Sequence, residues 1–339
     1  MNPHWRSFLE STDACFAADV PEVLHFGDAQ AELLAASRQT VLVPLTHLAS
    51  ISASGDEAKT FLHGQLTSDV NHLAQGAAQH AGWCTAKGRM QASFVVWHEN
   101  ESYRMLLAAD LLEATAKRLQ MFILRAKVKL QVESDTILLG LAGRQAAEAL
   151  ADAGLPIPES VMRATSSGDG TSIIHLDAQR YVLAAPVTAL PALWQKLGVK
   201  ARPAGLPAWR WLDVQAAFPL VSLATKEEFV PQMADFEKIG GVSFNKGCYP
   251  GQEIVARTQY LGKVKRHLYR LSGDVPLPAG ADLFSPDNLE QASGKIMLGA
   301  PSPAGGHVAL AVVQSNYAGN LRLGSRDGQE VTASAVNPA

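Results

Sequence analysis

The sequence is poor in cysteine and lacks long apolar runs. Its 339 residues include three cysteines, Cys15, Cys84 and Cys248, too widely spaced for a CxxC pair or a zinc site. An odd number of scattered cysteines excludes a disulfide framework and indicates a reducing, cytoplasmic setting. The amino-terminal residues lack the pattern of a secretory signal, and the most apolar later stretch, 182–194, contains two prolines. We therefore expect no membrane-spanning helix.

The sequence also lacks a large excess of either positive or negative charge. Charged residues make up 18% of the chain, and 32 acids against 29 bases leave a net charge of −3. This balance excludes a generally basic nucleic-acid-binding protein but is compatible with a local basic patch. The sequence also lacks GxSxG, GxGxxG and P-loop motifs. It therefore gives no support for a hydrolase, a dinucleotide-binding protein or an NTPase.

Hydrophobic patterning predicts an α+β fold with three modules after a lead-in segment at residues 1–40. We expect the order β-α-β-β-α-β in a first module, 41–135, and a looser version of it in a second, 136–262. Both would be ferredoxin-like split βαβ modules. The third module, 263–339, has six short β-rich runs separated by Gly, Pro, Asp and Asn, which is typical of a small barrel. The runs are 267–271, 281–284, 295–298, 307–313, 320–323 and 331–336.

The segment 239–257 holds the residues that are most indicative of chemistry. Cys248 lies two positions before Pro250, which we expect in the first turn of a helix. The helix N-terminus and the nearby Lys246 would both favour the thiolate form of Cys248. From spacing alone, a small residue that fills a turn explains Cys248 equally well. Glu253 and Arg257 fit an ordinary surface ion pair worth about 0.3–0.5 kcal/mol.

The run Lys246-Gly-Cys-Tyr-Pro-Gly-Gln-Glu253 resembles the KGC-aromatic-x-GQE signature of the YgfZ family. Members of that family bind folate, are linked to iron–sulfur enzyme maintenance and tRNA modification, and are related to the aminomethyltransferase (T-protein) of the glycine cleavage system. Supporting blocks are FLHGQLTSD at 61–69, CTAKGR at 84–89 and FVPQM at 229–233. The resemblance thus extends over most of the chain and is specific.

The resemblance implies a three-domain T-protein-like fold that binds tetrahydrofolate or a derivative. It implies that Trp209 contacts the pterin, whose flat ring gains from stacking on an indole, whereas core packing is the alternative for Trp209 and Trp211. The other implied cofactor-binding residues are Lys246, Gln252, Glu253 and Arg257. Cys248 would be the functional thiol. The implied partners are iron–sulfur enzymes or assembly proteins, with tRNA as an indirect partner, and any cluster contact must be shared because clusters normally take four thiolates.

The sequence departs from the family pattern at two places; the first concerns the pterin contact on that side of the site, and the second argues against a transferase. A second folate-linked tryptophan of the family is replaced near Leu48, and the catalytic carboxylate of the aminomethyltransferases is missing from 88–94. Without a carboxylate, one-carbon transfer lacks its acid/base group. We therefore expect an accessory protein, and a folate-dependent aminomethyl or one-carbon transferase, with Asp69 or Glu253 as the substitute carboxylate, is the alternative.

Residues 254–273 contain no acid and form a positive strip. Its basic members are Arg257, Lys263, Lys265, Arg266 and Arg270. The strip could hold an anionic folate tail or tRNA phosphate, or be an ordinary solvated face. The histidines at 63, 72, 80 and 98 lack metal-ligand spacing, so we expect no metal site.

Overall fold

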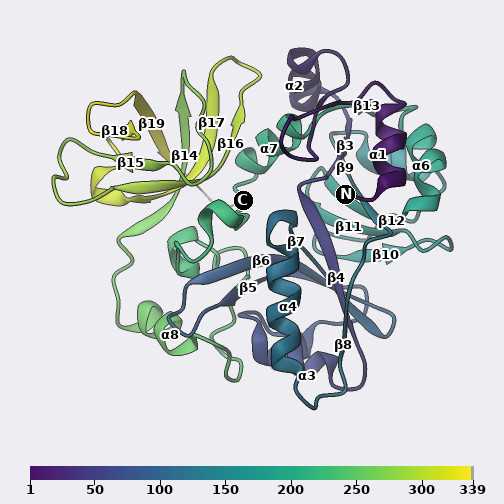
Figure 1. The fold of residues 1–339 in the computed structure, drawn as a ribbon, viewed down its shortest axis with the longest axis horizontal. Helices are drawn as coiled ribbons and strands as arrows, with labels where there is room; N and C mark the ends of the chain where they lie inside the picture. The colour runs from purple at the N-terminus through teal and green to yellow at the C-terminus, as the bar shows by residue number, and fades with distance from the viewer. Residues whose placement is uncertain (337–339) are drawn as a thin grey trace. The chain divides into compact units, whose positions relative to one another are not determined.

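The computed structural model describes residues 1–336, which fold into a mixture of helices and sheets (Figure 1). The α-helices are α1 (Pro3–Glu10), α2 (Ala29–Arg38), α3 (Ala58–Gln65), α4 (Leu112–Ile123), α5 (Ala146–Asp152), α6 (Leu190–Leu197), α7 (Leu206–Gln215) and α8 (Gln252–Tyr260). None of the helices within this range is long and apolar enough to cross a bilayer.

The strands form two larger sheets, one small sheet and a closed barrel. A six-stranded sheet has the order β10-β11-β12-β9-β3-β13, a five-stranded sheet has the order β5-β6-β7-β4-β8, and β1 pairs with β2. Outside the barrel, the strands are β1 (Cys15–Phe16), β2 (Val23–His25), β3 (Val41–Pro44), β4 (Leu48–Ser54), β5 (Ala78–Cys84), β6 (Met90–Glu99), β7 (Ser102–Ala108), β8 (Lys129–Val132), β9 (Thr136–Ala142), β10 (Ala164–Ser166), β11 (Ser172–Asp177), β12 (Arg180–Pro186) and β13 (Arg202–Pro203).

The chain divides into two compact units. Unit 1 comprises Met1–Ala58, Leu73–Ala78 and Val96–Trp209, and unit 2 comprises Lys59–His72, Gln79–Val95 and the chain from Arg210 onward. Three strands, β5, β6 and β7, lie between α3 and α4, where the sequence has three strand-like runs at 78–85, 90–97 and 103–108. The predicted module boundaries at 40, 135 and 262 stay a prediction.

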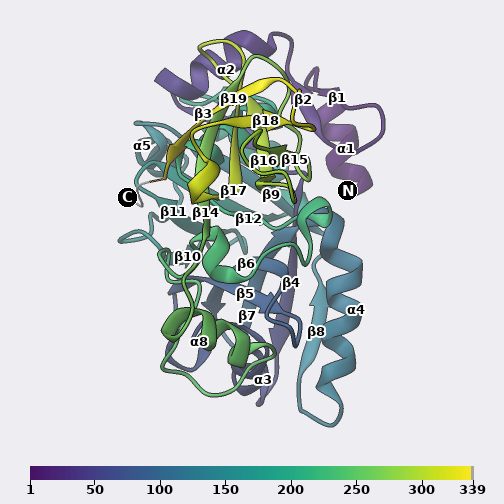
Figure 2. The same cartoon turned by 90° about the vertical axis from the view of Figure 1, so that its left-hand side faces the viewer.

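Unit 1 contains the six-stranded sheet, with β9 near its centre. Strand β9 is antiparallel to β3 and β12 and is buried from Ile137 to Ala142, as expected for a strand covered on both faces. Helix α4 presents Thr115, Leu119 and Ile123 as its buried side. In both ribbon views α4 lies along β8 (Figures 1 and 2).

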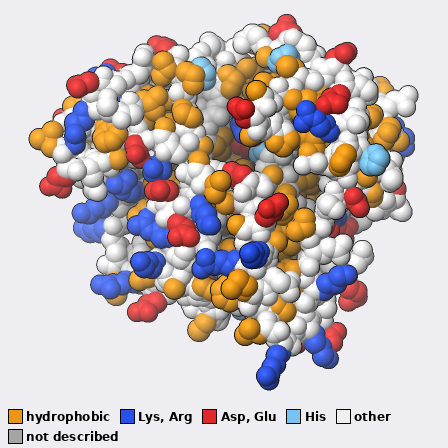
Figure 3. All heavy atoms as spheres, viewed as in Figure 1, with side chains coloured by type: hydrophobic (Ala, Val, Ile, Leu, Met, Phe, Trp, Pro, Cys, Tyr) orange, Lys and Arg blue, Asp and Glu red, His pale blue; other side chains and the backbone are white. Residues whose placement is uncertain are grey.

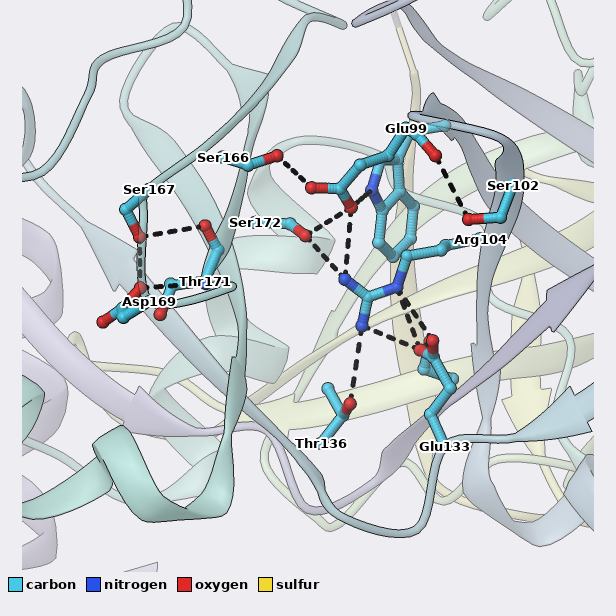
Figure 4. A network of polar contacts seen from close by, with 12 residues as sticks. Glu99, Ser102, Arg104, Glu133, Thr136, Ser166, Ser167, Asp169, Thr171 and Ser172 are labelled. Carbon is cyan, nitrogen blue, oxygen red and sulfur yellow. Dashed lines mark hydrogen bonds and ion pairs between the residues drawn. The ribbon is translucent and has the colours of Figure 1, made fainter.

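A partly buried ionic network joins the two larger sheets within unit 1 (Figure 4). The Arg104 guanidinium of β7 lies 3.2 Å from Glu99 and 2.8 Å from Glu133, and it donates to Ser172 of β11. Burial alone would raise the pKa of Glu99, but hydrogen bonds from Ser166 and Ser172 and the charge of Arg104 lower it. Each of these partly buried charges has partners of opposite charge and hydrogen bonds, so none of them bears the cost of an unpaired ion that is shielded from water.

Unit 2 ends in a closed barrel with the strand order β14-β17-β16-β15-β18-β19. The strands are β14 (Arg266–Gly273), β15 (Asp282–Phe284), β16 (Gly294–Pro301), β17 (His307–Gln314), β18 (Leu321–Leu323) and β19 (Glu330–Ala335). Each corresponds to one of the six predicted β-rich runs. Alternate residues of these strands fill the barrel, among them Leu271, Leu283, Ile296, Ala311 and Leu321. The predicted mixed fold with a C-terminal barrel is confirmed.

Candidate functional site

Residues 239–257, which we call the KGC segment, fold in unit 2 against the end of α3 and the β5–β6 hairpin. The link is Thr67, which is fully buried just after α3. Its hydroxyl donates to the carbonyl of Gly241 at 2.5 Å and accepts from the amide of Gly82 at 2.7 Å. Its carbonyl accepts from the amide of Ser243 at 2.9 Å. One threonine therefore fixes the start of the segment to two elements that precede it by more than a hundred residues.

Lys246 points into the protein, away from solvent. The residue is 8% exposed, and its ammonium donates to the main-chain carbonyls of His63 and Leu66 at the C-terminus of α3. These are carbonyls that the helix itself leaves without partners, and a cation is favoured at this end of a helix. The ammonium also lies 5.0 Å from the centre of the Tyr249 ring. Burial lowers the pKa of Lys246 to about 8, against a smaller opposing effect of Asp69.

A left-handed glycine separates Cys248 from helix α8. The helix begins at Gln252, with Gly251 as its N-cap at φ 81°. A Cβ on Gly251 would lie 2.3 Å from the Thr85 carbonyl oxygen and 2.7 Å from the Cα of Gly88, so only glycine fits here. Pro250 thus precedes the helix, and its predicted place in the first helical turn is wrong. The chain must turn tightly at residue 251 before it can become helical.

The two cysteines of unit 2 have opposite environments. Cys248 is exposed, whereas Cys84 is buried. Burial raises the pKa of the Cys84 thiol to about 12, which keeps it protonated and unreactive at neutral pH. Burial, with a smaller effect of Cys84, also raises the pKa of Tyr249. Of the two cysteines in unit 2, Cys248 is therefore the one with an accessible thiol.

A carboxylate flanked by two imidazoles lies beside the KGC segment. Asp69 Oδ1 is 3.2 Å from Nδ1 of His63, and Asp69 Oδ2 is 2.8 Å from Nδ1 of His72. Burial alone would raise the pKa of Asp69, but the hydrogen bond and charge of His72 lower it. Burial and the charge of Lys246 lower the pKa of His63, which favours a neutral ring. Nε2 of His63 lies 3.9 Å from where a Cβ on Gly247 would be.

Sequence reasoning did not find this cluster. It considered Asp69 only as a substitute carboxylate and set the histidines aside. The available signal was the spacing of Asp69 and His72, which places the two side chains on one side of a turn. Within residues 1–336, no group of three or more His, Cys, Asp or Glu side chains could hold a metal ion.

Three predicted residues of the segment remain: Gln252, whose side chain holds the loop, and Glu253 and Arg257, which face solvent. The Gln252 side chain donates to the main-chain carbonyl of Lys246 at 3.3 Å and closes the turn around Cys248. Glu253 and Arg257 are exposed on α8. The ion pair considered for them does not form in the described part of the chain. Both charges are therefore available to a ligand.

Trp209 belongs to unit 1 and is 1% exposed. The ring packs closely on Gly140 in the middle of β9, because a Cβ added to that glycine would lie only 2.4 Å from a ring carbon of Trp209. The Arg180 guanidinium lies 5.2 Å from the ring centre, a distance typical of a cation–π contact. The indole thus contributes to the packing of the six-stranded sheet.

In the stretch from which the carboxylate is missing, Gln91 has an unusual environment. The residue is 3% exposed, and its Oε1 has no hydrogen-bond partner among residues 1–336. A buried acceptor of this kind normally finds a partner, since leaving it without one costs about 1–3 kcal/mol. An N–H donor on a ligand would satisfy it.

The chain was compared with family models, curated proteins and solved structures. No protein-family model matches the chain. A tRNA-modifying protein YgfZ of Yersinia pestis (strain Pestoides F) is 32% identical over 260 residues, which cover 75% of this chain and 78% of that protein. A tRNA-modifying protein YgfZ of Colwellia psychrerythraea (strain 34H / ATCC BAA-681) is 32% identical over 251 residues, covering 74% and 76%.

Among solved structures, the glycine cleavage system aminomethyltransferase T of Bartonella henselae superposes with a TM-score of 0.85 at 21% identity. The alignment covers 99% of this chain and 96% of the other. At this identity the likeness establishes a shared fold.

Proposed function

Because the chain belongs to the YgfZ family, we propose that it is a tetrahydrofolate-binding accessory protein for the assembly or repair of iron–sulfur enzymes, including those that modify tRNA. The observation that carries the proposal is the arrangement of the KGC segment. Lys246 and Gln252 are used to shape the loop, while Cys248 is left exposed. A loop that is braced from inside and presents a thiol outward suits a transient contact with a partner's cluster.

Each unit, taken by itself, carries types of side chain that suit a part of a reduced folate. In unit 2, the Arg257 guanidinium suits the carboxylates of the glutamate tail, and the Glu253 carboxylate and Gln91 Oε1 suit the N–H donors of the pterin. In unit 1, Trp209 offers a ring for stacking. Reduced folate, when bound, supplies a carrier for one-carbon units. The buried Lys246 would act on the ligand through the shape of its loop.

Cys248→Ala is expected to abolish the support of iron–sulfur enzymes. The thiol is exposed, so we expect the melting temperature to stay the same while the variant fails to restore iron–sulfur-dependent tRNA modification in cells that lack the protein. Cys15→Ala, which removes the exposed cysteine of unit 1, is the matched control and should restore it fully. Full restoration by Cys248→Ala would show that the thiol of Cys248 is not needed.

Trp209→Phe is expected to weaken the quenching of tryptophan fluorescence by tetrahydrofolate. The ring is 1% exposed, so a pterin reaches it only if neighbouring side chains move, and phenylalanine would keep an aromatic ring at this position while it removes the indole. Trp211→Phe, two residues on and partly exposed, is the control and should be quenched like the wild type. Equal quenching of all three proteins would remove Trp209 from the site, and no quenching or calorimetric binding in the wild type would refute folate binding.

A further inference from the structure

The C-terminal end of α8 and the segment after it expose an unusual set of side chains. We call this the α8 surface, and it consists of Arg257, Tyr260, Leu261, Lys263 and Lys265. Tyr260 is 67% exposed and Leu261 is 84% exposed. The two residues are consecutive in the chain, so an aromatic ring and an aliphatic side chain are both open to a ligand at this point.

The cations of the α8 surface have no acidic partners in the described chain. Ion pairs hold other basic side chains of unit 2, such as Lys238 with Asp235 and Lys295 with Asp282. Arg270, farther along the strip, donates to main-chain carbonyls. The three basic residues of the α8 surface, Arg257, Lys263 and Lys265, make none of the ion pairs found within residues 1–336. Their positive charge is therefore directed outward.

The space-filling view also shows positive charge on this part of the surface. Lys and Arg side chains gather where α8 and the segment leading to β14 are drawn (Figure 3). The chain as a whole carries a net charge of −3, so attraction of an anion depends on this local field. Three cations without acidic partners lie on the same short segment as an exposed tyrosine, whose ring contacts Phe244 edge-on. This combination is the one by which proteins hold single-stranded nucleic acid, with phosphates on the cations and a base stacked on the ring.

We propose that the α8 surface binds RNA, with phosphates on Lys263 and Lys265 and an unpaired base stacked on Tyr260. The proposal deepens the proposed function, on which it rests, by naming a direct RNA contact in place of an indirect one. An acidic protein would satisfy the lysines equally well, but RNA brings both a phosphate chain for the lysines and unpaired flat bases for the exposed tyrosine in one ligand. Arg257 is open to both folate and RNA, so it is left out of the test.

The test is fluorescence anisotropy of the full chain with a fluorescein-labelled RNA stem–loop. Lys263→Ala/Lys265→Ala is expected to raise Kd by about tenfold and to reduce the slope of log K against log salt by about one unit or more. Lys117→Ala/Arg118→Ala, which removes two exposed cations from α4, is the charge-matched control and should bind like the wild type. Equal losses in both double variants, or no RNA binding by the wild type, would overturn the proposal.

Tyr260 distinguishes RNA from an acidic protein. Tyr260→Ala is expected to raise Kd for the stem–loop by at least about fivefold, whereas Tyr260→Phe retains the ring and should bind normally. A polyglutamate peptide should compete weakly. If it competes as well as RNA and Tyr260→Ala has no effect, the surface is a site for an acidic protein and the RNA proposal is wrong. Failure of this proposal is separable from that of the proposed function, because Cys248→Ala is tested by restoration in cells and not by RNA binding.

Discussion

Replacing Gly251 by alanine is expected to lower the free energy of unfolding by more than about 3 kcal/mol. Two costs combine. A left-handed backbone conformation is unfavourable for a residue with a Cβ, at about 1–2 kcal/mol, and Gly251 has φ 81°. The Cβ would also lie 2.3 Å from the carbonyl oxygen of Thr85 and 2.7 Å from the Cα of Gly88. Both of these are main-chain atoms, so the β5–β6 turn would have to move away from the KGC segment.

Urea unfolding measures this effect, and Gly240→Ala isolates its steric part. Gly240 has a similar backbone conformation, with φ 75°, but nothing lies within 4 Å of its added Cβ. Its variant should therefore lose only the conformational cost of about 1–2 kcal/mol. Equal losses at the two glycines would show that the close approach of the β5–β6 turn to Gly251 is not needed for stability. Under the proposed function, the Gly251 variant should also fail to support iron–sulfur enzymes, because the loop that presents Cys248 would be displaced.

Lys246→Met is expected to change stability in a way that depends on pH. Burial lowers the folded-state pKa of Lys246 from 10.5 to about 8, so the unfolded chain binds more protons than the folded chain between these values. The stability of the wild type should therefore rise with pH across this window. The variant has no such proton, so its stability relative to the wild type should fall by an amount on the order of 2 kcal/mol between about pH 7 and about pH 10. At every pH the variant also leaves the carbonyls of His63 and Leu66 without their donor.

The measurement is urea unfolding of both proteins at a series of pH values. Because other groups titrate in the same range, the informative quantity is the difference between the two proteins. Lys263→Met, which removes an exposed lysine from the same unit, should give a difference from the wild type that does not vary with pH. A Lys246→Met difference that is constant, or that shrinks as pH rises, would show that burial does not control this ammonium.

The barrel shows how much of the fold local patterns determine. All six predicted β-rich runs are strands, because alternation of apolar residues and turn-forming Gly, Pro, Asp and Asn act over a few neighbouring residues. Their pairing was not predictable in the same way. Strand β14 pairs with both β17 and β19, and closure of this kind depends on contacts between segments tens of residues apart.

By itself, the sequence determined the fold class, the terminal barrel and the KGC segment as the feature of interest, since each depends on residues close together in the chain. Only the tertiary structure decided what each residue of that segment does. Lys246 binds two carbonyls about 180 positions away, and Asp69 meets two imidazoles from different turns. Every residue has a main-chain carbonyl, so the residue types at positions 63 and 66 do not indicate that a distant lysine binds there.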